Sequence, residues 1–254
     1  MVVFTNMIEN YLQISVITVK KLAAGMILTA LLAGCDNASA PLSFTPEMAS
    51  FSNEFDFDPL RGPVKDFSQT LLNEKGEVAK RVSGTLSTEG CFDTLEIHDV
   101  ESNSGVALVL NANFYLDAQT SEKKVRLQGK CQLAELMPAG LSWDTNDAGF
   151  VVSAHGPKTE VNYRYDRDGY PLGKTTVSGE QKLSVSATPS ADLRKRLDYR
   201  AVSTLNDKTL GSVRQSCDYD RHDNPVECEL KIVDESVKPV QERKYTIKNT
   251  IEYY

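Results

Sequence analysis

The sequence predicts an all-β fold: one domain whose antiparallel sheet is built from repeated β-hairpins. An extended half-apolar run, a polar turn of about four residues and a second extended run recur along the chain, whereas helical periodicity is scarce. Asp, Asn and Gly supply the turn conformations, and the alternating flanks bury one face of a sheet. The pattern occurs in five segments: TLLNEKGEVAKR (70–81), TLSTEGCFDTLEI (85–97), LSWDTNDAGFVVSA (141–154), VNYRYDRDGYPLGKTT (161–176) and QSCDYDRHDNPVECELKIV (215–233).

The charge pattern excludes one class of partner. The 254 residues carry a net charge of −7, and acids and bases are interspersed rather than grouped in runs. Such a surface argues against a nucleic-acid site and against a polybasic membrane patch. We therefore expect no nucleic acid among the partners.

The N-terminal region has the pattern of a signal peptide. Residues 22–34 form an apolar run of 13 residues directly after Lys20 and Lys21. That run is too short for a spanning helix of about 20 residues but fits the core of an export signal. We expect residues 1–34 to be the signal peptide, and we hypothesise that translation begins at Val19 because the preceding residues fit a signal poorly.

The end of this run, LAGC, resembles the lipobox of bacterial lipoproteins. The resemblance implies cleavage before Cys35, a diacylglycerol on its sulfur and a palmitoyl group on its new amino terminus. Two or more acyl chains give stable membrane anchoring. Asp36 resembles the signal that retains enterobacterial lipoproteins in the inner membrane, which would place the body in the periplasm.

We expect residues 35–58 to form the lipidated N-terminus and a tether, and residues 59–254 to form the periplasmic β domain. Small and polar residues dominate the first part of the tether, which favours a flexible spacer. Phe51, Phe55 and Phe57 mark where the tether is expected to dock onto the body.

Four further cysteines allow three disulfide connectivities, and an oxidising compartment favours two bonds. If the last hairpin turns between His222 and Asp223, opposed residue numbers sum to 445, so Cys217 faces Cys228 and Tyr219 faces Val226. Directly opposed residues lie close enough for a disulfide. We therefore predict the bonds Cys217–Cys228 and Cys91–Cys131.

Two short helical segments and a final strand complete the expected elements. Residues 131–137 stop before a proline, and residues 190–197 begin with a serine cap and end with basic residues. Each predicts at most two helical turns. The C-terminal segment KYTIKNTIEYY alternates, which predicts a last strand with Tyr245, Ile247, Ile251 and Tyr253 on one face.

No catalytic or metal-binding motif is recognisable, so we expect neither an enzyme nor a cofactor. His98, His155 and His222 lie at no metal-ligand spacing and are expected at the surface or in turns. Two acidic clusters, Asp56 with Asp58 and Asp218 with Asp220 and Asp223, are hypotheses for Ca²⁺ binding. Turn capping is the favoured interpretation of both clusters.

Aromatic residues on the predicted strands allow two interpretations. Core or cross-strand packing is favoured, and a face that binds carbohydrate or peptide is the alternative. The residues are Trp143, Tyr163, Tyr165, Tyr170, Tyr199, Tyr219, Tyr245 and Tyr253.

Two family resemblances extend this interpretation. The segment YRYDRDGYPLGKTT resembles the YD repeats of RHS-type proteins, which implies wound antiparallel ribbons. The lipobox with Asp36, the segments LSFTPEMASFSNEFDFDPLRGPVKDF and VDESVKPVQERKYTIKNTIEYY, and the four cysteines together resemble the YnfC family of enterobacterial lipoproteins. That resemblance implies an inner-membrane lipoprotein and lends no activity.

We expect a non-enzymatic domain that binds a periplasmic protein or glycan, in addition to the membrane lipid that holds the anchor. A hydrolase of envelope glycan or peptide with dispersed carboxylates is one alternative. A carrier whose curved sheet encloses an apolar ligand is another.

Overall fold

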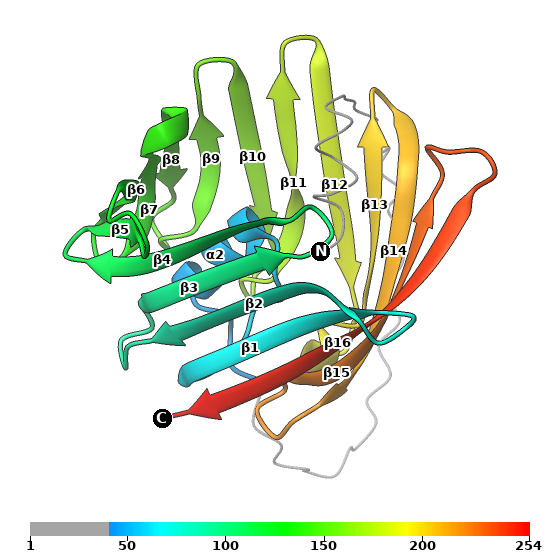
Figure 1. The fold of residues 1–254 in the computed structure, drawn as a ribbon, viewed down its shortest axis with the longest axis horizontal. Helices are drawn as coiled ribbons and strands as arrows, with labels where there is room; N and C mark the ends of the chain where they lie inside the picture. The colour runs from blue at the N-terminus through cyan, green and yellow to red at the C-terminus, as the bar shows by residue number, and fades with distance from the viewer. Residues whose placement is uncertain (1–40) are drawn as a thin grey trace, which may run out of the picture.

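Sixteen strands in residues 41–254, the part that this computed structural model describes, form one closed antiparallel barrel (Figure 1). Each strand pairs with its neighbours in sequence, and β1 pairs with β16, which closes the sheet. The strands are β1 (Val64–Asn73), β2 (Val78–Leu86), β3 (Phe92–Asp99), β4 (Ser104–Asn111), β5 (Phe114–Asp117), β6 (Lys123–Gln128), β7 (Gln132–Leu136), β8 (Leu141–Thr145), β9 (Val151–His155), β10 (Thr159–Tyr165), β11 (Pro171–Ser178), β12 (Gln181–Pro189), β13 (Tyr199–Leu205), β14 (Lys208–Tyr219), β15 (Pro225–Asp234) and β16 (Gln241–Tyr253).

The α-helix α2 (Pro46–Phe55) lies inside the barrel, with β1 to β4 in front of it in Figure 1 and further strands behind. It forms where Thr45 caps the first turn, its hydroxyl accepting a hydrogen bond from the Met48 amide at 3.2 Å, and where Pro46 occupies the first helical turn. It ends at Asp56, which adopts the left-handed conformation. Among the described residues no helix combines the length and apolar character needed to cross a membrane.

Aromatic packing joins the helix to the wall. The Phe51 ring stacks on Phe92 of β3 at 4.7 Å between centroids and meets Tyr115 of β5 edge-on at 5.6 Å. Just past the helix, Phe57 stacks on Phe67 of β1 at 5.7 Å. All five side chains are almost completely buried, so the helix is part of the barrel core.

Two lysines from the wall bind the C-terminal end of α2. Lys174 Nζ donates to the Asn53 carbonyl at 2.8 Å and lies 3.4 Å from the Asp56 carboxylate. Lys80 Nζ donates to the Asp56 carbonyl at 3.1 Å. These cations satisfy carbonyl groups that a helix end leaves unpaired and that carry partial negative charge.

The expected tether over residues 35–58 is therefore wrong for its second half. Residues 46–55 form a buried helix rather than a spacer, because their aromatic and small residues fill the barrel. The expectation that Phe51, Phe55 and Phe57 dock onto the body is confirmed: two are buried and Phe55 packs against the core. The signal peptide, Cys35 and Asp36 lie outside the described residues.

Three further expectations need correction. Within residues 131–137, Gln132–Leu136 forms strand β7 rather than a helix, because it pairs with β6 and β8 and this pairing overrides local propensity. Met137 begins the short 3₁₀ helix η1 (Met137–Ala139). Within residues 190–197 the short 3₁₀ helix η2 (Leu193–Lys195) agrees with the expected limit of two turns, but its cap is Asp192 rather than a serine. The hairpins continue into one another as a closed meander, so the resemblance to YD-repeat ribbons is not supported.

Both expected disulfides are present. Cys91 is bonded to Cys131, with Cα atoms 5.9 Å apart, and Cys217 is bonded to Cys228 across the β14–β15 hairpin, with Cα atoms 4.0 Å apart. The register pairs Cys217 with Cys228 as the sum of 445 predicts. Tyr219 instead faces Pro225, because a bulge between Asp218 and Tyr219 shifts the register by one residue.

Replacing Phe51 with alanine should destabilise the whole barrel. Truncating a fully buried phenylalanine costs about 3 to 5 kcal/mol in free energy of unfolding. Urea denaturation followed by circular dichroism measures the loss, with Phe114→Ala as the control because that side chain is half-exposed on the wall. A loss below about 1 kcal/mol for Phe51→Ala, within the range of surface substitutions, would show that α2 is not part of the core.

Candidate functional site

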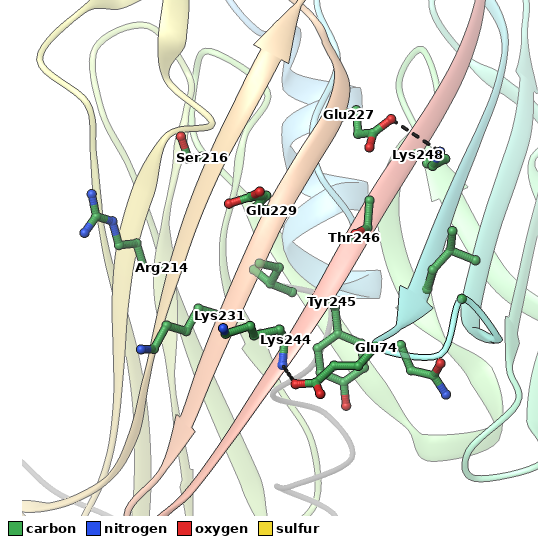
Figure 2. A pocket seen from close by; sticks show the side chains of 14 residues that line it. Glu74, Arg214, Ser216, Glu227, Glu229, Lys231, Lys244, Tyr245, Thr246 and Lys248 are labelled. Carbon is green, nitrogen blue, oxygen red and sulfur yellow. Dashed lines mark hydrogen bonds and ion pairs between the residues drawn. The ribbon is translucent and has the colours of Figure 1, made fainter.

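A groove of about 740 Å³ lies on the outer face of the barrel, over β14, β15, β16 and the turn between β1 and β2 (Figure 2). Charged side chains dominate its lining: Glu74, Arg214, Glu227, Glu229, Lys231, Lys244 and Lys248. Alternate residues of each strand point outward, which places these groups on one surface while their neighbours in sequence fill the core.

Four cations cross the outer face in a single row. Arg200 of β13 is directly opposite Arg214 of β14, Arg214 is opposite Lys231 of β15, and Lys231 is opposite Lys244 of β16. All four are exposed, and Figure 2 shows the last three side by side. We call these four residues the cationic row. Like charges in directly opposed positions destabilise a sheet, so the row is unfavourable for folding alone.

Acidic neighbours neutralise only part of the row. Lys231 Nζ lies 2.7 Å from Glu242, and the Lys244 backbone amide donates to Glu74 at 3.1 Å. Within residues 41–254 neither Arg200 nor Arg214 has an ion pair or a side-chain hydrogen bond. Two guanidinium groups therefore remain available to an external acidic group.

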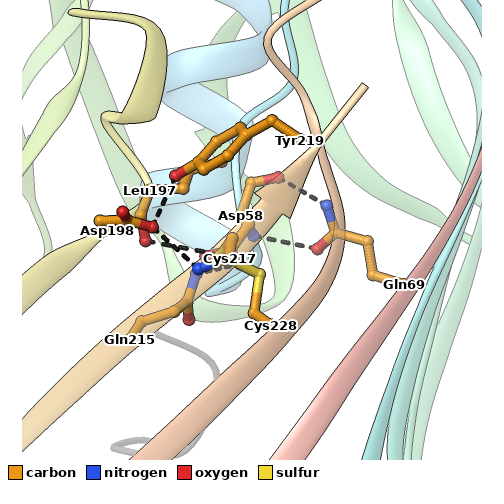
Figure 3. The surroundings of a disulfide bond; sticks show 8 residues. All are labelled: Asp58, Gln69, Leu197, Asp198, Gln215, Cys217, Tyr219 and Cys228. Carbon is orange, nitrogen blue, oxygen red and sulfur yellow. Dashed lines mark hydrogen bonds between the residues drawn. A yellow bond between two sulfur atoms is a disulfide. The ribbon is translucent and has the colours of Figure 1, made fainter. Parts of the chain in front are cut away.

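Beside the Cys217–Cys228 bond, a second polar cluster lies inside the barrel (Figure 3). The buried Asp58 carboxylate accepts a hydrogen bond from Gln215 Nε2 at 2.9 Å. The Asp58 backbone exchanges two hydrogen bonds with the Gln69 side chain, at 3.0 and 2.7 Å. The adjoining cavity is about 10 Å³, room for about one water molecule at most. This cluster fixes the chain after α2 to the wall and admits no substrate.

Several tyrosines are buried or half-buried in the barrel interior, near the Asp58 cluster and near α2. Burial, followed by the Asp58 charge, raises the pKa of Tyr170 and Tyr199 well above the usual value. Burial raises the pKa of Tyr163 as well, with Glu54, to which its hydroxyl donates, as the next cause. Burial also raises the pKa of Tyr165, to about 12. These phenols are therefore neutral in the folded barrel.

The acidic clusters considered for Ca²⁺ are engaged separately. Asp56 lies against Lys174, and Asp58 binds Gln215 inside the barrel. Asp220 accepts the backbone amides of the β14–β15 turn, and Asp223 pairs with Arg194 at 3.2 Å. In the part of the chain that the structure describes, no three His, Cys, Asp or Glu side chains could jointly hold a metal ion. Turn capping and structural pairing account for Asp56, Asp58, Asp220 and Asp223, whereas Asp218 is exposed on β14, opposite Glu227.

The three histidines lie at the surface or in a turn, and the predicted aromatic residues lie in or against the core. His98 and His155 are exposed, and His222 lies half-buried in the β14–β15 turn, stacked on Tyr253 at 3.9 Å. Of the eight predicted aromatic residues, five are buried and the other three are half-buried. They form no exposed binding face, which confirms the packing interpretation.

The cationic row was not predicted from the sequence, although one of its opposed pairs, Arg214 and Lys231, could have been. The sum of 445 that pairs the two cysteines also pairs Arg214 with Lys231. Arg200 and Lys244 depend on the register of two neighbouring hairpins, whose turns and bulges are not evident from residue type.

High pH should unfold the barrel through its tyrosines. Burial raises the pKa of Tyr163, Tyr170 and Tyr199 in the folded state, so their stabilising contribution is complete below the unfolded value of about 10 and is lost as the pH rises above it. We expect tyrosinate absorbance and the loss of near-ultraviolet circular dichroism to rise in one cooperative transition above about pH 10. Ionisation of all tyrosines near pH 10 in a still folded protein would contradict this account.

Comparison with solved structures gives only a distant likeness. A porin-like protein from Bacteroides uniformis aligns with 74% of this chain and 96% of its own, at 10% sequence identity and a TM-score of 0.38. A likeness this weak assigns neither fold nor function.

Comparison with known sequences is far more specific. Proteins called UPF0257 lipoprotein YnfC from Salmonella dublin and Salmonella typhimurium are each 68% identical over 228 residues, covering 90% of this chain and 97% of theirs. The relative from Salmonella typhi is 67% identical over the same length. Residues 19–254 match the model described as "Uncharacterised protein family (UPF0257)", and the chain therefore belongs to the UPF0257 family.

Proposed function

We propose that this chain is a lipoprotein held in the inner membrane through Cys35, and that its barrel works in the periplasm, without catalysis, by binding an acidic partner on the cationic row. The name lipoprotein carried by the relatives and the LAGC motif support the anchor. Asp36 supports retention in the inner membrane. The row itself is the observation that carries the binding proposal.

Folding leaves positive charge uncompensated on the outer face of the barrel. Arg200, Arg214 and Lys231 are directly opposed on the exposed face, and the two arginines have no acidic partner among the described residues. Arginine presents a planar fork of donors that suits carboxylates and phosphates. A partner that places carboxylates or phosphates on the row offsets the repulsion between its cations. Relief of this electrostatic repulsion therefore favours binding.

The groove offers less support for the hydrolase alternative. It contains Glu227 and Glu229, two outward carboxylates on β15. A general acid at neutral pH needs an environment that keeps its proton, usually burial, and both groups are open to solvent. Glu227 is also paired with Lys248 at 3.4 Å. The carrier alternative has less support, because α2 fills the centre of the barrel with buried side chains and the cavity beside Asp58 is only about 10 Å³.

Charge reversal of the row tests the binding proposal. In intact envelopes, the double variant Arg200→Glu with Arg214→Glu should give about tenfold less crosslinked product than the original chain. That change equals about 1.4 kcal/mol, the size expected when two exposed charge contacts are lost. Quantitative mass spectrometry of the crosslinked species measures it, and the captured partner should be acidic.

Lys123→Glu with Lys208→Glu is the matched control, because it reverses two exposed cations that lie away from the row. It should leave the crosslinked yield unchanged. In the row variant the two new acids face each other as the two arginines did, so the repulsion within that pair persists, whereas the acid at position 214 gains Lys231 as an opposite charge. Its urea midpoint should therefore not fall. Equal yields for the two double variants would rule out the row as the binding surface.

The anchor has its own test. Cys35→Ser should release the protein from the membrane fraction, because it removes the sulfur that takes the diacylglycerol. Asp36→Ser should leave the protein lipidated but move it to the outer-membrane fraction on a density gradient. Inner-membrane fractionation of the Asp36→Ser variant would contradict the proposed role of Asp36.

A further inference from the structure

The chain enters the barrel at one defined end. The Phe44 amide donates to the Asp168 carbonyl at 2.9 Å, and the Phe44 ring lies between Tyr170 and the guanidinium of Arg61, which is 4.3 Å from the ring centroid. A Cβ added at Gly62 would come within 3.5 Å of Leu42 and 3.9 Å of His222. The entering chain is thus fixed against the turns of β10–β11 and β14–β15.

We call this the entry end, and it includes every second turn of the meander. Because neighbouring strands run antiparallel, the connections β10–β11, β12–β13 and β14–β15 are at the same end. The β14–β15 turn is at the bottom of Figure 1, and the turns β9–β10, β11–β12 and β13–β14 are at the top. Lys75 in the β1–β2 turn, Lys123 after the β5–β6 turn and Lys208 after the β13–β14 turn belong to the far end.

The distance from the expected anchor is short. Leu42 is the seventh residue after Cys35. Even a fully extended chain spans at most about 3.6 Å per residue, so Leu42 lies within about 25 Å of the lipidated sulfur. A barrel fixed at Phe44 cannot turn its far end to the bilayer on so short a connection.

Exposed cations stand at the tips of the entry-end turns. Arg167 is 80% exposed, and Lys195 and Arg221 are exposed in the next two turns. Arg167 Nε is 3.7 Å from Asp168, a loose pair that solvent weakens. In these three turns Asp192, which caps η2, is the exposed acid, whereas Glu89 and Asp147 are exposed in the β2–β3 and β8–β9 turns of the same end. These three cations are far apart in the sequence, and the fold brings them to one end.

The acids of the same turns are directed back into the protein. Asp166 and Asp220 accept backbone amides of their own turns, Asp223 pairs with Arg194, and Asp198 accepts from Cys217 and Tyr219. Asp166 also pairs with Arg196. The outermost charged groups of the β10–β11, β12–β13 and β14–β15 turns are therefore mostly positive.

Apolar side chains accompany the cations. Leu42 is 58% exposed, and Tyr254, whose amide donates to the Pro63 carbonyl, is 54% exposed. Val226 at the start of β15 is exposed as well. Basic residues mixed with Leu and Tyr are the composition of surfaces that lie at the headgroup level of a membrane.

We infer that the entry end, on the side of its β10–β11, β12–β13 and β14–β15 turns, rests on the anionic headgroup surface of the bilayer that holds Cys35, with Arg167, Lys195 and Arg221 in contact with lipid phosphates and the far end facing the periplasm. This inference rests on the proposed lipid anchor. It goes beyond anchoring, because it fixes the orientation of the barrel relative to the membrane.

Lysine labelling tests the orientation. The acylated full-length protein is bound to vesicles containing phosphatidylglycerol and treated with a membrane-impermeant acetylating reagent, and the rate at each lysine is measured by mass spectrometry. Relative to Cys35→Ser protein with the same vesicles, Lys195 should react at least threefold more slowly. Lys75 and Lys208, which are exposed at the far end, should react at unchanged rates.

Charge variants show whether the cations make the contact. Arg167→Glu with Arg221→Glu should restore the Lys195 rate, whereas the far-end pair Lys123→Glu with Lys208→Glu should leave Lys195 protected. Equal labelling of Lys195 and Lys75 in acylated protein, or protection of Lys75 instead, would overturn the inference alone. A Cys35 peptide without acyl mass would overturn the proposed anchor, and the orientation with it.

Discussion

The structure depends on helix α2 filling the inside of its own barrel. A barrel of about eight strands can be filled by wall side chains, but a wider barrel leaves space at its centre. Here Phe51 and Phe57 supply apolar volume to that space, and Lys80 and Lys174 from the wall bind the helix carbonyls. Residues 44–58 are thus a structural part of the domain.

A filled interior leaves the outer face and the two ends for any interaction. Asp58, the most enclosed acid near the helix, is used to hold the chain to Gln215 and Gln69. The uncompensated charge is instead outside, at Arg200 and Arg214. The proposed binding surface on the wall is compatible with a filled centre, whereas a carrier needs an empty one.

The fold class, both disulfides and the last strand could be predicted, because alternation, turn residues and the pairing of Cys217 with Cys228 are local signals. Closure of the barrel could not, since the pairing of β1 with β16 joins residues nearly a whole domain apart. The helix was missed although Thr45 and Pro46 form a recognisable start, because its burial all round leaves no amphipathic stripe to detect. The cationic row exists only through the register of three successive hairpins.

Hydrogen exchange of the α2 backbone amides tests the filled barrel most directly. If the helix is core, its interior amides from Ser50 to Phe55 are released only by global unfolding and exchange as slowly as the slowest amides of β1 and β15. We expect the same opening free energy for α2, β1 and β15. Added denaturant should lower this free energy equally in all three elements. Exchange of α2 that is orders of magnitude faster than that of the two strands would show that the barrel stands without its helix.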